Sequence, residues 1–338
     1  MEKPNYGRTG LLSSRLGGLP VTRPRLLLPG SPAVSRPVKW YPSLLTIPQQ
    51  LLDALRREGD GEDAADGISG ATTVFSADPT LITYLRVATI AESLVQWWRR
   101  WAASEAPQQT TAAPGPTSPS RERLAALYTA VLQCCRDGLA NGEMASPSSP
   151  ERDPASPPNV IFIPTYKLLV MKDDRKVAEL ANITWRSLWL FGKEPGVNDV
   201  LLEHPSCSSQ HASLEMRFVL VDEAALNAYI AETVKATTPD APVLAPLGAD
   251  VPVFAQSKRA LESLCRGMWA VLEEAQTAAG GDASAVWTAE LQLTDLGSTN
   301  HTRLNGEVMP SMEATTVIDG DVLEFGLSTR KYVVMRSA

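Results

Sequence analysis

Residues 191–217 read FGKEPGVNDVLLEHPSCSSQHASLEMR, and residues 294–326 read TDLGSTNHTRLNGEVMPSMEATTVIDGDVLEFG. In and around both stretches, short runs rich in apolar, β-branched and aromatic residues alternate with turns, a pattern typical of strands that bury one face. The predicted strands are 166–172, 187–191, 200–203, 212–221, 287–296, 322–325 and 331–335. Their close spacing predicts a β-sandwich in the C-terminal half of the chain.

Four blocks of residues follow one another in these stretches. They are Gly192-Lys193, Ser208-x-x-His211, Ser298-Thr299-Asn300 and the hairpin signal Asn305-Gly306. This pattern resembles the forkhead-associated (FHA) domain over roughly residues 160–222 and 286–337. The runs LEHPSCSSQHA (202–212) and FGLSTRKYVVM (325–335) resemble the Smad nuclear-interacting protein family, whose members serve the pre-mRNA retention and splicing complex of the spliceosome.

The FHA resemblance implies an eleven-strand sandwich whose loops at one end bind a phosphothreonine peptide. A phosphate carries about −1.5 to −2 charges and needs charge-assisted hydrogen bonds from rigid supports. The resemblance implies phosphopeptide contacts from Lys193 as the cation, Ser208 as a hydroxyl donor, Ser209 in the same loop, Thr299, and Asn300 on the peptide backbone. It implies loop support from Gly192, His211, Asn305 and Gly306.

Two residues depart from the family pattern. Lys193 stands where the pattern has arginine, and an ammonium group lacks the planar fork that makes two hydrogen bonds to one phosphate. His301 stands where the pattern has glycine, so a positive φ at this position would strain the backbone. Two alternatives follow: a phosphothreonine reader, and a degenerate FHA domain that binds an unphosphorylated partner.

Composition and periodicity organise the rest of the chain. Stretches rich in Pro and Ser at 104–120 and 143–158 are typical of linkers. Apolar residues at helical spacing predict helices at 48–58, 79–103 and 120–139, and two more within 222–285. The expected fold class is α+β. In chain order we expect a disordered basic arm at 1–40, a small helical module at 41–142, a linker at 143–158, and an FHA domain at 159–338 with a helical insertion at about 222–285.

The first 40 residues have the opposite charge to the rest. Seven Lys and Arg residues stand against Glu2 alone, so the arm is +6 whereas the whole chain is −7. We expect the arm to contact RNA or an acidic partner, with a passive tail as the alternative. Lys39 and Trp40 resemble the short peptides that insert a tryptophan into RRM-type domains of splicing factors. Alternatively, Trp40 is the first core residue of the helical module.

Other classes of protein lack support. No P-loop, nucleophile elbow, HExxH or kinase motif occurs, so no catalytic residue and no cofactor is expected. The four cysteines lack zinc spacing, which predicts no metal site and a reducing compartment. The sequence contains no run of about 18 apolar residues, so we expect no membrane-spanning helix.

The expected function is therefore that of a non-enzymatic, nuclear scaffold of the spliceosome, acting in pre-mRNA splicing through protein–protein contacts. The alternatives are an FHA adaptor related to the nuclear inhibitor of type-one phosphatase or to kanadaptin, and an FHA module associated with an enzyme.

Overall fold

The computed structural model describes residues 42–53, 72–76, 79–105, 121–144, 160–236 and 258–337. These residues form two compact units. The first takes its described residues from Met1–Phe75, Phe162–Phe218 and Ala289–Ala338, and the second from Ser76–Ile161 and Val219–Thr288. The basic arm with Lys39 and Trp40, and most of both Pro-rich linkers, lie outside the described residues.

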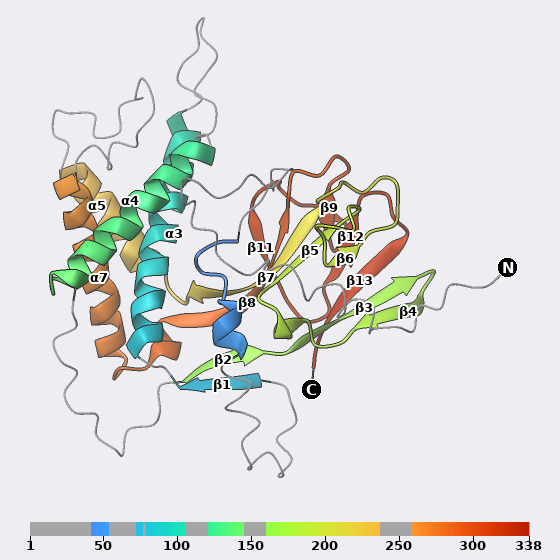
Figure 1. Cartoon of the computed structure of the whole chain (residues 1–338), viewed down its shortest axis with the longest axis horizontal. Helices are drawn as coiled ribbons and strands as arrows, with labels where there is room; N and C mark the ends of the chain where they lie inside the picture. Colours follow the sequence, from blue (N-terminus) through green and yellow to red (C-terminus); the bar gives the residue numbers. More distant parts are fainter. Residues whose placement is uncertain are drawn as a thin grey trace, which may run out of the picture. The chain divides into compact units, whose positions relative to one another are not determined.

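The first unit is a sandwich of two β-sheets (Figure 1). Its strands are β3 (Tyr166–Lys172), β4 (Arg175–Leu180), β5 (Leu188–Gly192), β6 (Val200–Leu201), β7 (Ala212–Leu220), β8 (Trp287–Asp295), β9 (Thr302–Leu304), β10 (Glu307–Val308), β11 (Ala314–Val317), β12 (Val322–Phe325) and β13 (Arg330–Arg336). One sheet has six strands in the order β10-β9-β12-β13-β3-β4, and the other has five in the order β11-β8-β7-β5-β6. The predicted α+β fold class, with a C-terminal β-sandwich, is confirmed.

The core of this unit lies between the two sheets. Buried and partly exposed side chains alternate along β3, because successive residues of a strand point to opposite faces. Three aromatic rings meet in the middle, with centroids between 5.0 and 6.1 Å apart: Phe191, Phe325 and Tyr332. Such rings contribute a large buried apolar area and prefer these stacked and edge-to-face arrangements. They hold the two sheets together beneath the loops at the end of β5.

The sequence pattern does not predict six of the described strands. Four belong to the sandwich: β4, β9, β10 and β11. The other two are β1 (Thr72–Ser76) and β2 (Val160–Pro164), which pair with each other. β9 and β10 have three and two residues, too few to show a period. β4 and β11 are edge strands whose side chains are largely exposed, so they lack the alternation on which the prediction depends.

Residues 45–47 lie along β7 of the sandwich. Thr46 bridges Arg217, and the Ile47 N–H and Leu45 C=O form hydrogen bonds of 2.9 Å with the backbone of β7. Leu45, Ile47 and Leu52 are buried. The sequence pattern assigns this segment to the helical module at 41–142, whereas in the structure it belongs to the first unit, with its apolar side chains buried. The helix expected at 48–58 is described only over 49–53.

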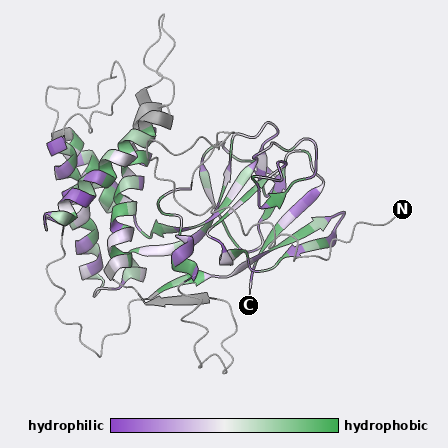
Figure 2. Ribbon diagram, viewed as in Figure 1, coloured by the Kyte–Doolittle hydropathy of each residue, from purple (hydrophilic) through white to green (hydrophobic). Residues whose placement is uncertain are grey.

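The second unit contains four described helices, α3 (Pro79–Glu105), α4 (Arg121–Ala140), α5 (Ala224–Ala236) and α7 (Lys258–Ala278). α7 packs against the other three helices. Hydrophobic and hydrophilic residues both occur along α4 and along α7 (Figure 2). Trp287 donates its indole N–H to the Thr89 hydroxyl at 2.8 Å. The helices of the predicted module and of the predicted insertion thus share one core. Periodicity identifies each apolar stripe but does not show which stripes face one another.

No described helix is both long and apolar enough to cross a bilayer. Within the same residues, no three His, Cys, Asp or Glu side chains are grouped so that they could hold a metal ion.

Candidate functional site

Three loops of the sandwich come together: the first follows β5, the second lies between β6 and β7, and the third follows β8. They span 193–199, 202–211 and 296–301. The Lys193 N–H donates to the Ser208 carbonyl at 3.0 Å, which joins the first loop to the second. The Thr299 N–H donates to the Ser208 hydroxyl oxygen at 3.1 Å, which joins the third loop to the second. The fold therefore brings together Lys193, Ser208 and Thr299, three of the residues predicted to contact a phosphopeptide.

Gly192 allows the first two loops to approach each other. A Cβ atom on Gly192 would lie 2.3 Å from the carbonyl oxygen of Ser209 and 2.7 Å from the Oδ1 atom of Asn198. Both distances are far below van der Waals contact, so any side chain here would push the Lys193 loop away from Ser209. The absence of a side chain at Gly192 is therefore what lets these two loops lie together.

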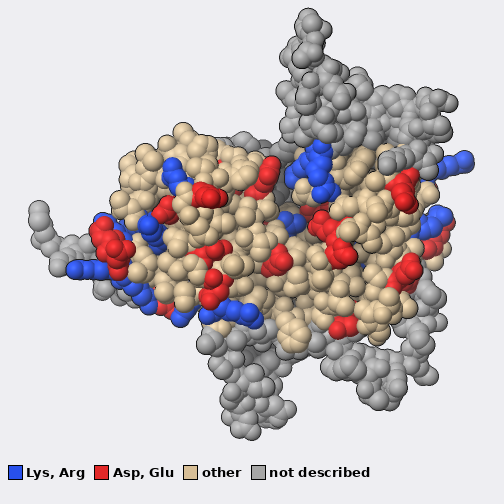
Figure 3. All heavy atoms as spheres, turned by 180° about the vertical axis from the view of Figure 1, so that it is seen from behind, with Lys and Arg blue, Asp and Glu red and all other residues tan. Residues whose placement is uncertain are grey.

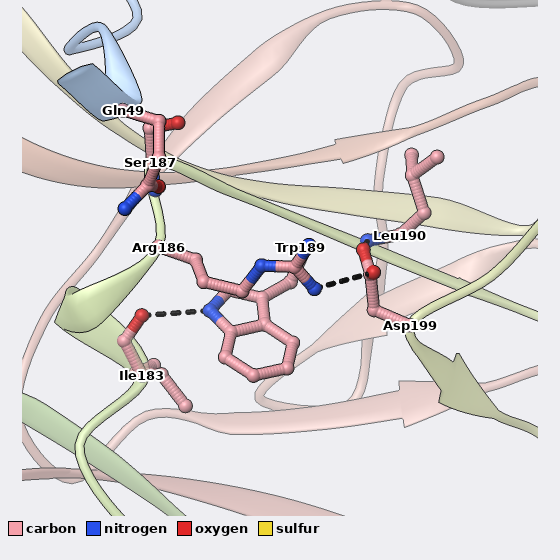
Figure 4. A network of polar contacts seen from close by, with 7 residues as sticks. All are labelled: Gln49, Ile183, Arg186, Ser187, Trp189, Leu190 and Asp199. Atoms are coloured by element: carbon pink, nitrogen blue, oxygen red, sulfur yellow. Dashed lines mark hydrogen bonds and ion pairs between the residues drawn. The ribbon is translucent and has the colours of Figure 1, made fainter. Parts of the chain in front are cut away.

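A buried ion pair fixes the far end of the first loop (Figure 4). The Asp199 carboxylate accepts a hydrogen bond of 2.6 Å from Arg186 and one of 2.9 Å from the Leu190 N–H. The Arg186 guanidinium carbon lies 5.4 Å from the ring centroids of both Trp185 and Trp189. Burial raises the pKa of Asp199, against the opposing attraction of Arg186. The loop therefore ends on a group that is enclosed on several sides.

The start of the same loop is open to solvent. Lys193 is exposed, and its ammonium forms no ion pair within the part of the chain that the structure describes. A cation held on an ordered backbone, with its charge uncompensated, is suited to an incoming anion.

His211 supports the second loop from below. Its ring is fully buried, and Nδ1 accepts the Ser208 N–H at 3.1 Å. Nε2 must therefore carry the proton, which it donates to the His301 carbonyl at 3.2 Å. Burial lowers the pKa of His211, which favours this neutral form. His211 thus connects the second and third loops.

The Asp295 carboxylate organises the third loop. It is fully buried and accepts six hydrogen bonds of 2.6 to 3.0 Å, from Gly297, Ser298, Thr302 and Ser311. Burial alone would raise the pKa of Asp295, but the hydrogen bonds outweigh it and the pKa lies below its ordinary value. The sequence places this residue beside a turn, where aspartate commonly satisfies backbone donors, and the structure shows that role.

Asn300 and His301 complete the third loop. Asn300 donates its side-chain N–H to the Ser206 carbonyl at 2.8 Å, so its amide nitrogen holds two loops together. His301 has φ 58°, a left-handed conformation that glycine adopts without strain. The glycine of the family pattern would suit this backbone, and the histidine here strains it.

Asn305 and Gly306 form a turn after β9. Their φ angles of 54° and 85° are those of the tight hairpin turns that Asn-Gly favours. Asn305 donates to the Asp321 carboxylate at 2.8 Å and accepts the Val322 N–H at 2.9 Å. These contacts connect the turn after β9 with the start of β12, and none of them reaches Lys193 or Ser208.

Two groups at the site escape sequence reasoning. Asn198 donates to the Glu194 and Ser209 carbonyls, and Arg186 pairs with Asp199 thirteen residues away. No motif marks these partners, because they meet only after β5 and β6 lie side by side. Asp199 alone offers a weak signal, as an acidic residue at the start of an apolar strand.

Two comparisons by sequence match the FHA domain. Residues 281–326 match the model of the FHA domain family. The FHA domain-containing protein DDL of Arabidopsis thaliana is 38% identical over 52 residues, which is 15% of this chain and only 17% of that protein.

Solved structures resemble the chain at low identity. The yeast Pml1 splicing factor, described with its integration into the RES complex, is 17% identical over 51% of this chain and 79% of its own, with a TM-score of 0.28. The yeast Dun1 FHA domain, solved with a doubly phosphorylated peptide derived from Rad53, is 14% identical over 57% of this chain and 86% of its own, with a TM-score of 0.28.

The family match spans β8 to β12 and includes the third loop with Asp295, Thr299 and Asn300. The loops that carry Lys193 and Ser208 lie outside the matched residues but belong to the same sandwich. The chain therefore contains an FHA domain, a protein-interaction module.

Proposed function

We propose that this protein is a non-enzymatic scaffold that reads phosphothreonine peptides and acts in pre-mRNA splicing through protein–protein contacts. The observation that carries the first part is the meeting of Lys193, Ser208 and Thr299 on three loops that buried groups hold in place. Phosphopeptide readers bind phosphate with clustered, fixed donors of this kind.

The hydrogen bonds already present define what each group offers a phosphate. The Ser208 hydroxyl oxygen accepts the Thr299 N–H, so its own proton is left for a phosphate oxygen. Lys193 supplies a positive charge, which interacts with phosphate as a point charge rather than through a planar fork. Binding then depends on several single hydrogen bonds. A partner without phosphate is the second candidate, and the lysine at 193 together with the strained His301 favours it.

The splicing role rests on the resemblance of residues 202–212 and 325–335 to the Smad nuclear-interacting protein family. It implies a nuclear protein with spliceosomal partners. We propose that Lys39 and Trp40 anchor an RRM-type subunit and that the arm contacts RNA. On the face drawn in Figure 3, acidic and basic side chains of the described residues lie close together. The +6 arm is therefore the better candidate for RNA contact than that face.

Binding is tested with the full chain and a degenerate peptide library centred on phosphothreonine, beside the same library without phosphate. We expect the phosphorylated library to bind, and Lys193→Ala to weaken binding about tenfold or more, since a charge-assisted hydrogen bond is lost. Lys172→Ala, which removes an exposed lysine at the end of β3, is the matched control and should bind normally. Equal binding by Lys193→Ala would contradict the role of Lys193, and equal binding of both libraries would favour the second candidate.

The splicing role is tested by affinity purification of the tagged chain from its own cells. Recovery of spliceosomal proteins, lost when Trp40 is changed to Ala, is the expected result. Recovery of a phosphatase without spliceosomal proteins would contradict the splicing role and would favour an adaptor related to the nuclear inhibitor of type-one phosphatase.

A further inference from the structure

Asn198 lies where the two loops that carry Lys193 and Ser208 meet. It is 7% exposed, and its amide packs against Gly192 in the space that a Cβ atom would occupy. Its Nδ2 atom donates to the Ser209 carbonyl at 2.6 Å and to the Glu194 carbonyl at 2.9 Å. One side chain therefore connects the residue that follows Lys193 with the residue that follows Ser208.

The backbone of the two loops is joined just beyond the β5–β7 ladder, which ends with the His211 N–H donating to the Phe191 carbonyl at 2.8 Å. Past that point the Lys193 and Glu194 N–H groups donate to the Ser208 and Ser209 carbonyls at 3.0 and 3.2 Å, and β5 itself ends at Gly192. Each Nδ2 hydrogen bond of Asn198 braces one end of this short junction. A shift of either loop would change the distance between the Lys193 ammonium and the Ser208 hydroxyl.

The hydrogen-bonding groups of the Asn198 amide are not all satisfied, which is unfavourable for stability. Its Oδ1 atom is buried and has no hydrogen-bond partner among the described residues. An unpaired buried acceptor costs free energy, and in native structures such a group calls for an explanation. The Ser209 and Glu194 carbonyls each also accept a backbone N–H, so neither needs Asn198 in order to be satisfied.

We infer that Asn198 is a positioning residue for phosphate recognition: it sets the separation of Lys193 and Ser208 without contacting the ligand. This inference rests on the proposed function and deepens it. The two carbonyls remain paired without Asn198, so its removal acts on loop geometry more than on the fold. A phosphate needs both donors at one fixed spacing, and a loss of geometry weakens several hydrogen bonds at once.

The test compares full-length wild type with Asn198→Ala and with Asn198→Leu, which keeps the branched shape of the side chain, removes both donors and adds no charge. The probe is the tightest-binding peptide selected from the phosphothreonine library, measured by fluorescence anisotropy. We expect affinity to fall between about fivefold and about 25-fold, since a change in spacing weakens one or two hydrogen bonds to the phosphate and each is worth roughly a factor of five. Amide hydrogen exchange at Lys193 and Glu194, measured by NMR without peptide, should accelerate in both variants.

Val334→Ala is the matched control for a loss of stability. Val334 is fully buried in β13, away from the three loops, and this variant should lower the melting temperature while its peptide affinity stays within twofold of wild type. If the Asn198 variants bind the peptide as tightly as wild type, the inference is wrong. If wild type itself does not bind, the proposed function fails, and the exchange experiment still decides on Asn198: unchanged protection at Lys193 and Glu194 would overturn its positioning role.

Discussion

Replacing Asp295 by asparagine removes one negative charge from the centre of the third loop and changes almost nothing in shape. In the structure, Oδ1 accepts the Gly297 and Ser298 N–H groups and the Ser311 hydroxyl. Oδ2 accepts the Thr302 N–H and the hydroxyls of Ser298 and Thr302. An asparagine keeps an acceptor at only one of these two oxygen positions.

The magnitude follows from these six hydrogen bonds. Three bonds to Oδ1 would lose their charge, at about 1 kcal/mol each, because bonds to charged groups are worth roughly twice those to neutral ones. At the Oδ2 position, hydroxyl groups turn to accept the new amide N–H, but the buried Thr302 N–H is left facing another donor, which costs about 1 to 3 kcal/mol. We expect Asp295→Asn to lower the free energy of unfolding by about 4 to 6 kcal/mol, a large part of the total for a domain.

Urea unfolding, followed by tryptophan fluorescence and far-UV circular dichroism, measures this loss, and amide exchange at Thr302 reports it locally. Asp319→Asn is the matched control, because Asp319 is exposed and accepts a single N–H, from Arg336. It should cost less than about 1 kcal/mol. A loss in Asp295→Asn no greater than that in Asp319→Asn would refute the view that this carboxylate organises the loop.

Three further predictions concern pH, backbone strain and the N-terminal segment. The folded pKa of Asp295 lies below its unfolded value of about 3.9, so its contribution is present above pH ~4 and is lost as pH falls through the folded pKa; acid titration should therefore bring wild type and Asp295→Asn together. His301→Gly should stabilise the protein by about 1 kcal/mol, because it relieves a positive φ, and a lower melting temperature would contradict this. Ile47→Ala should cost about 3 kcal/mol in the unfolding of the sandwich, because Ile47 is fully buried beside β7, and a neutral result would show that the segment is dispensable.

The sequence determines the sandwich because its main strands bury one face, and a buried face leaves a two-residue period that can be read directly. β7, β8, β12 and β13 leave such a period, whereas β5 is a continuous apolar run that is buried throughout. The sequence also identifies Gly192, Ser208 and His211, since these residue types at this spacing resemble a known motif. β4 is largely exposed and β10 consists of two exposed residues, so neither leaves such a pattern and both are found only in the structure.

Tertiary structure alone decides which distant groups share a location. The pairing of Arg186 with Asp199, the double donation by Asn198, the docking of Ile47 on β7 and the common core of α3, α4, α5 and α7 all depend on close approach in space. Periodicity records only that a side chain is buried, whereas a hydrogen bond depends on distance and angle between atoms that may be separated by a hundred residues or more. The sequence thus determined the kind of domain and the loops that bear its site, and only the fold decided how those loops are held.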